Sequence, residues 1–111
     1  MLWPFGRGKR HPKISPLQLF RPSPEVKASF HSDGIAFLDL GTGAVLNANL
    51  LAARIWQAAV DGKSLNGIVE ELSRDLASPE DVVRPDVERF LRQLLEKRLL
   101  ICDGKHSEAL R

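Results

Sequence analysis

The sequence predicts an α+β domain in the winged-helix style, with a three-stranded antiparallel sheet followed by a three-helix bundle. Short apolar segments separated by Gly-containing turns occupy residues 26–48, as in a meander of antiparallel strands. Apolar residues then recur at helical spacing between residues 49 and 95. The expected element order is β-β-β-α-α-α in one domain, because 111 residues are too few for two.

Three strands are expected before residue 49. Val26, Ala28 and Phe30 alternate with polar residues, which is the pattern of a half-buried strand. The second segment begins with a continuous apolar run, as a central strand would, and an Asp-Gly pair before it readily adopts positive φ in a turn. The expected strands cover residues 26–30, 35–40 and 44–48, joined by turns at residues 32–34 and 41–43.

Three amphipathic helices are expected after the strands. Asn49 and Ser64 cap the first two, because their side-chain oxygens can accept bonds from the free N–H groups of a first turn. Gly62 ends the first helix, and Pro85 is expected at the first position of the third, after a helical turn at residues 78–81. The expected buried faces are Ala52, Ile55, Trp56, Ala59 and Val60; Leu65, Ile68, Val69, Leu72 and Leu76; and Val87, Phe90, Leu91, Leu94 and Leu95.

Residues 1–24 differ in composition from the rest of the chain. They hold five of the seven prolines, and proline interrupts both helices and sheet ladders. We therefore expect a flexible, basic, proline-rich arm over residues 1–24, a folded domain over residues 25–102 and a C-terminal tail over residues 103–111.

The net charge of +2 is unevenly distributed. Residues 1–27 carry six Lys or Arg and one acid, whereas residues 28–111 carry ten Lys or Arg and thirteen acids. The folded body is therefore expected to be slightly acidic, which disfavours nucleic-acid binding. No apolar run approaches the ~20 residues of a membrane-spanning helix, and a single cysteine fits a reducing compartment. We expect a cytoplasmic protein with no membrane partner.

No catalytic or metal-binding constellation is visible. His11, His31 and His106 are scattered, and their spacing to acids and to Cys102 matches no ligand set. Cys102 has no basic neighbour in sequence that would activate it, so an inert, partly buried thiol is expected. These observations favour a protein that is not an enzyme and that needs no cofactor.

An ordered set of turn, cap and core positions resembles the PqqD family over roughly residues 20–102. That family includes pyrroloquinoline quinone biosynthesis protein D and the leader-binding proteins of lasso-peptide clusters. At three positions the chain departs from the family's usual residues, with Ala48 in place of Leu, Val45 in place of an aromatic residue and Arg98 in place of Gly. The segments that carry the resemblance are residues 33–43, Asn49, residues 52–56, Asp61-Gly62, Asp86-Val87, Phe90-Leu91, Leu94 and Leu99-Leu100.

The resemblance implies a recognition element for ribosomally synthesised and post-translationally modified peptides (RiPPs). A leader peptide would add as a further strand to the exposed third strand, beside a groove walled by the third helix. The implied partners are this precursor peptide and a separate maturation enzyme, either a leader peptidase or a radical enzyme that uses S-adenosylmethionine. The implied peptide-binding residues are Ala44, Val45, Leu46, Asn47 and Ala48 on the strand, and Asp86, Arg89, Phe90 and Gln93 on the helix.

Several alternatives stay open at this point. Phe90 is also a plausible core residue, and the strand at residues 44–48 could be covered by the N-terminal arm or by a second copy of the chain in a homodimer. The sequence does not decide whether Val45 or Leu46 faces the groove. A winged-helix nucleic-acid binder is the rival function, and a structural subunit of a biosynthetic complex is a third.

Overall fold

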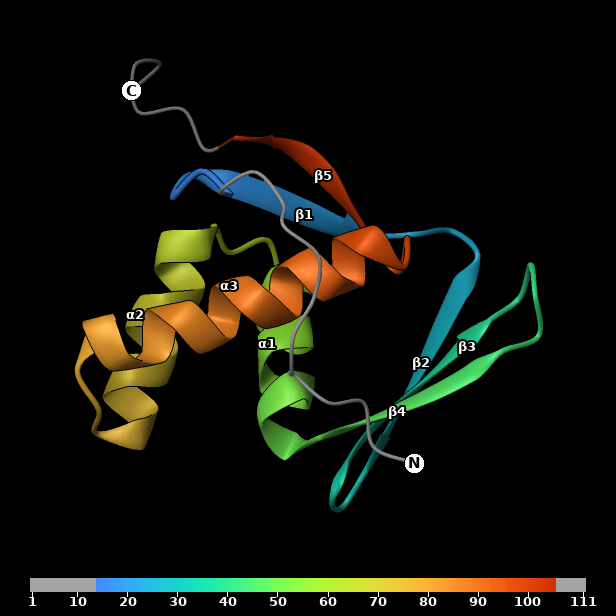
Figure 1. Ribbon diagram of the computed structural model, residues 1–111, viewed down its shortest axis with the longest axis horizontal. Helices are drawn as coiled ribbons and strands as arrows, with labels where there is room; N and C mark the ends of the chain where they lie inside the picture. Colours follow the sequence, from blue (N-terminus) through green and yellow to red (C-terminus); the bar gives the residue numbers. More distant parts are fainter. Residues whose placement is uncertain (1–13, 106–111) are drawn as a thin grey trace.

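The computed structural model describes residues 14–105, and it places a three-stranded antiparallel sheet beside three helices (Figure 1). The sheet has the strand order β2-β3-β4, which confirms the expected meander. A further sheet, of two strands, joins the two ends of the described chain. The elements are β1 (Gln18–Pro22), β2 (Val26–His31), β3 (Gly34–Asp39), β4 (Val45–Asn49), α1 (Leu50–Val60), α2 (Leu65–Leu76), α3 (Glu80–Glu96) and β5 (Leu100–Lys105).

The turn between β2 and β3 consists of two residues, Ser32 and Asp33, because His31 pairs directly with Gly34. Gly34 therefore belongs to β3, and it is not among the described residues with positive φ. It is required for another reason. A Cβ atom at Gly34 would overlap the carbonyl oxygen of Ala48 on β4, so only glycine allows the two strands to approach this closely.

Side-chain caps begin the first two helices, as expected. The Asn49 side chain accepts a hydrogen bond from the Ala52 amide at 2.9 Å, and the Ser64 hydroxyl accepts one from the Gly67 amide at 3.2 Å. The prediction that Pro85 is the first residue of the third helix is wrong, because α3 begins at Glu80 and contains Pro85. Pro79 serves as the N-cap, and Glu80 and Asp81 place negative charge in the first turn, where the helix dipole favours it.

All three helices end in the same way, with one residue in the left-handed conformation. These residues are Gly62, Ala77 and Arg98, with φ of 96°, 53° and 61°. In each case the amide of this residue donates to a carbonyl three residues earlier, as the Arg98 amide does to Leu95 at 3.1 Å. The following amide donates to a carbonyl five residues earlier, as the Leu99 amide does to Leu94 at 2.9 Å. This pair of bonds is the Schellman motif, which normally selects glycine at the left-handed position.

The expected irregular arm over residues 1–24 is wrong for Gln18–Pro22, which form β1 and pair antiparallel with β5. The expected tail is likewise wrong for residues 103–105, which belong to β5. Pro16 and Pro24 flank β1 and Pro22 ends it, so no proline lies in the middle of the strand, where Phe20 is only 3% exposed. Residues 1–13 and 106–111, with most of the basic arm, His11 and His106, lie outside the described residues.

The core lies where the helices meet the inner face of β3. Phe37 and Trp56 form an edge-to-face pair with ring centroids 4.8 Å apart, and the expected stripe residues of all three helices are largely buried. Val60 and Leu76, at the ends of their helices, are exposed instead. The expectation that β2 is half buried is wrong for Ala28 and Phe30, because no described helix contributes more than marginal contacts to β2.

Candidate functional site

Strand β4 forms one edge of the three-stranded sheet among the described residues. The Asp39 amide donates to the Ala44 carbonyl at 2.9 Å, and this bond fixes the alternation of the ladder. Leu46 and Ala48, which oppose Phe37 and Ile35, direct their backbone groups toward β3. By the same alternation Val45 and Asn47 direct their N–H and C=O groups away from the sheet. The open edge therefore presents the backbone groups of two residues to a further strand.

The side chains of β4 divide between the two faces of the sheet. Leu46 is half buried and packs against the core, and Ala48 is 2% exposed. Val45 is 58% exposed on the opposite face, opposite Leu38. Leu46 thus faces the helices and Val45 faces away from them, which decides the orientation that the sequence left open.

On α3, the four residues that the resemblance implicates differ in accessibility. Phe90 is completely buried and Gln93 is 8% exposed, so both belong mainly to the packed interior. Asp86 and Arg89 are half buried and form an ion pair of 3.3 Å with one another. The accessible polar groups that α3 offers among these four are therefore one carboxylate and one guanidinium.

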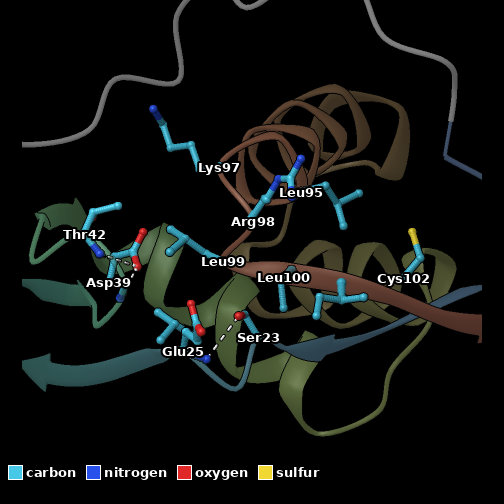
Figure 2. A pocket seen from close by; sticks show the side chains of 13 residues that line it. Ser23, Glu25, Asp39, Thr42, Leu95, Lys97, Arg98, Leu99, Leu100 and Cys102 are labelled. Atoms are coloured by element: carbon cyan, nitrogen blue, oxygen red, sulfur yellow. Dashed lines mark hydrogen bonds between the residues drawn. The ribbon is translucent and has the colours of Figure 1, made fainter.

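A cavity of about 730 Å³ lies at the end of the sheet where β3 turns into β4 (Figure 2). Its apolar lining includes Val26, Leu95 and Leu99. Charged residues border it on two sides, with Glu25 and Asp39 from the strands, and Lys97 and Arg98 from the end of α3. This cavity could not be predicted from the sequence, because the end of α3 and β5 meet strand residues that lie more than 50 positions earlier in the chain. Its one signal in the sequence is the pair of cations before Leu99-Leu100.

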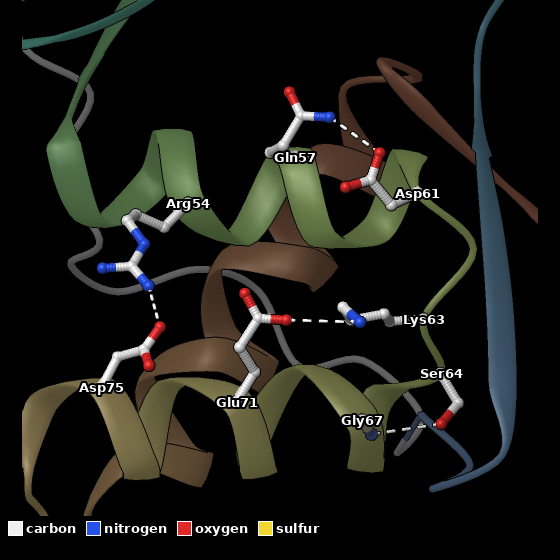
Figure 3. A network of polar contacts seen from close by, with 8 residues as sticks. All are labelled: Arg54, Gln57, Asp61, Lys63, Ser64, Gly67, Glu71 and Asp75. Atoms are coloured by element: carbon white, nitrogen blue, oxygen red, sulfur yellow. Dashed lines mark hydrogen bonds and ion pairs between the residues drawn. The ribbon is translucent and has the colours of Figure 1, made fainter.

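Polar contacts link α1 to α2 and the loop before it (Figure 3). Arg54 pairs with Asp75, and Lys63 pairs with Glu71 at 3.4 Å. These pairs are partly exposed, so each contributes at most about 1 kcal/mol to stability. The pairing also neutralises Arg54 on α1 and Lys63 in the loop before α2, which reduces the positive potential that binding of duplex DNA would require.

A second, shallower cavity of about 360 Å³ lies beside this network. It is lined in part by Phe30 and Leu50, which are 52% and 53% exposed.

Within residues 14–105, no three His, Cys, Asp or Glu side chains are grouped so that they could hold a metal ion. None of the described helices has the length and apolarity needed to cross a membrane.

The expectation that Cys102 is partly buried is wrong, since its side chain is exposed and lines the larger cavity. Cys102 lies on β5, where it is paired with Phe20 of β1.

The order of strands and helices, with β4 at one edge of the three-stranded sheet, defines a winged-helix-like α+β domain. Residues 34–100 match the family model of coenzyme PQQ synthesis protein D, and the chain belongs to this PqqD family. No curated protein matches the chain.

Two solved structures are similar to this fold. The first is described as TbiB1 in complex with the TbiA(beta) leader peptide, with 26% identity, a TM-score of 0.67, and coverage of 78% of this chain and 99% of that one. The second is described as lasso peptide synthetase B1 complexed with the leader peptide, with 24% identity, a TM-score of 0.68, and coverage of 74% and 96%. The second likeness concerns the fold alone.

Proposed function

We propose that this protein is a non-catalytic, cytoplasmic adaptor that binds the leader of a ribosomally made precursor peptide by strand addition to β4. It would present the bound precursor to a separate enzyme, either a leader peptidase or a radical enzyme that uses S-adenosylmethionine. The observation that carries the proposal is the open edge of β4 in a PqqD-family domain. The similar structure of TbiB1, which was solved with a leader peptide, supports it.

The chemistry of the edge supports strand addition. Sheet edges in soluble proteins are usually protected by charge or proline, and β4 has neither. The outward N–H and C=O groups of Val45 and Asn47 would pair with an extended peptide, and main-chain bonds of this kind give affinity without demanding a particular sequence. Selectivity would then come from side chains on alternate positions of the peptide, some of them near Asp86 and Arg89.

The ladder pattern supplies a sharp test. Asn47→Pro removes an outward N–H and leaves the bonds between β3 and β4 in place, whereas Leu46→Pro would break one of those bonds and damage the fold. We expect saturable binding of a fluorescein-labelled leader peptide, taken from the precursor encoded beside this gene, in fluorescence anisotropy. Asn47→Pro should weaken binding at least about 10-fold, because a bond is lost and the proline ring blocks the edge.

The matched control is Ala28→Pro on β2, the other edge of the sheet. The Leu40 amide donates to the Glu25 carbonyl at 2.8 Å, so the same alternation points the Ala28 N–H away from β3. This variant should bind the leader as the wild type does. Equal losses in both variants, or no binding at tens of micromolar with or without the neighbouring enzyme, would contradict the proposal. Salt-sensitive binding of duplex DNA would then favour the nucleic-acid alternative.

A further inference from the structure

The cavity lies at the turn between β3 and β4, which is the Val45 end of the edge proposed to bind the peptide. Gly41 and Thr42 line it, and they precede β4 by only a few residues. A peptide that pairs along β4 and continues past Val45 therefore runs toward the turn that borders this cavity. The apolar lining by Val26, Leu95 and Leu99 offers contact to such a continuation, and the volume of about 730 Å³ is larger than one side chain needs.

Arg98 borders this cavity in an unfavourable backbone conformation. Its φ of 61° lies in the left-handed region, which glycine tolerates and an arginine occupies at a cost. Its side chain is exposed and forms no ion pair with any other residue between positions 14 and 105. Neither helix termination nor packing in the described structure requires a guanidinium at this position.

The acids on the facing wall are not equivalent. Asp39 Oδ1 accepts hydrogen bonds from the amides of Gly41 and Thr42 at 2.9 Å and 3.4 Å, so this carboxylate closes the turn. Glu25 is exposed and has no ion-pair partner in the described part of the chain. Its negative charge would repel a peptide carboxylate from the strand side of the cavity and leave the Arg98 side as the favourable position.

We propose that this cavity binds the segment of the leader peptide that continues beyond β4, and that Arg98 selects an acidic side chain in that segment. This inference rests on the proposed function and adds a charge requirement to it. An arginine can bind a carboxylate through two parallel N–H donors, which gives directional selectivity as well as attraction. The contact lies at the surface, so its contribution should fall as ionic strength rises.

The test uses the full chain with the leader peptide and with versions in which each Asp or Glu is changed to its amide. Arg98→Gly should bind the native leader about 3- to 10-fold more weakly. With the wild-type protein, one of the amide peptides should bind more weakly than the native leader by a similar factor. With Arg98→Gly, the same amide peptide should bind as well as the native leader does. Glu25→Gln, the control on the facing wall, should bind at least as well as the wild type. Arg98→Glu should regain affinity for the leader that carries Lys at the sensitive position.

Cys102 provides an independent readout, because it is the single cysteine of the chain and lines the same cavity. Saturating leader should slow its alkylation by iodoacetamide at least about 3-fold. Three results would overturn the inference while leaving strand addition intact: unchanged affinity of Arg98→Gly, equal binding of every amide peptide, or unprotected Cys102 in a complex that anisotropy shows to be formed. Absence of any leader binding would instead overturn the proposed function, and this inference with it.

Discussion

Gly34 on β3 lies directly against the carbonyl group of Ala48 on β4, in the space that a side chain would occupy. This contact holds the edge strand at its position beside β3. Gly34→Ala should therefore destabilise the protein by about 1–3 kcal/mol, because the new methyl group forces the two strands apart. Urea denaturation followed by circular dichroism measures the change.

Gly67 in α2 is the matched control for that substitution. A Cβ atom there would make ordinary contacts, the nearest being the Lys63 Cβ at 3.4 Å. Gly67→Ala should be neutral or stabilise by up to about 1 kcal/mol, since alanine favours the helix. A stable Gly34→Ala variant would show that the close approach of β3 and β4 is not needed.

The left-handed residues at the helix ends give a second prediction. Substitution to glycine should raise stability, and substitution of glycine should lower it. Ala77→Gly and Arg98→Gly should each stabilise the protein by about 0.5–1 kcal/mol, because glycine adopts positive φ without a Cβ clash. Gly62→Ala should destabilise it by a similar amount. The three melting temperatures, compared at one pH, decide the matter. Destabilisation by Arg98→Gly would mean that the arginine side chain supports the fold.

Two phenylalanines test whether β1 belongs to the folded domain. Phe20 on β1 is 3% exposed and Phe30 on β2 is 52% exposed. Phe20→Ala should cost about 3–5 kcal/mol, as truncation of a buried ring does, whereas Phe30→Ala should cost less than about 1 kcal/mol. Chemical denaturation of both variants provides the comparison, and equal costs would argue that β1 is dispensable.

The N-caps permit a fourth prediction, on the junction between the proposed binding strand and the helices. Asn49 ends β4 and caps α1, so Asn49→Ala should lower stability by about 1 kcal/mol. Ser64→Ala, which removes the cap of α2, should have a similar effect without touching the sheet. If β4 binds the leader, Asn49→Ala should weaken leader affinity more than Ser64→Ala does, which anisotropy can measure. Equal affinities would show that the cap does not position the edge.

The order of the three-stranded sheet and the helices could be predicted from the sequence, because each rests on local chemistry. Each of these signals determines the conformation of residues only a few positions away. They are the alternation of polar and apolar residues, the caps at Asn49 and Ser64, and the left-handed Gly62. The same local signals, in their order along the chain, carried the resemblance to the PqqD family. The sequence also indicated the edge strand and the class of function.

The tertiary structure alone decided the rest. The strand Gln18–Pro22 is stabilised by pairing with residues about 80 positions later, and no local pattern reports such a partner. The start of α3 at Glu80 is the exception, because Pro79 and the acids of the first turn are local signals, and the prediction gave more weight to Pro85. Burial of Phe20, exposure of Phe30 and the cavity beside Arg98 all depend on which segments meet in space. Periodicity specifies which face of an element is apolar, but only packing decides whether another element covers that face.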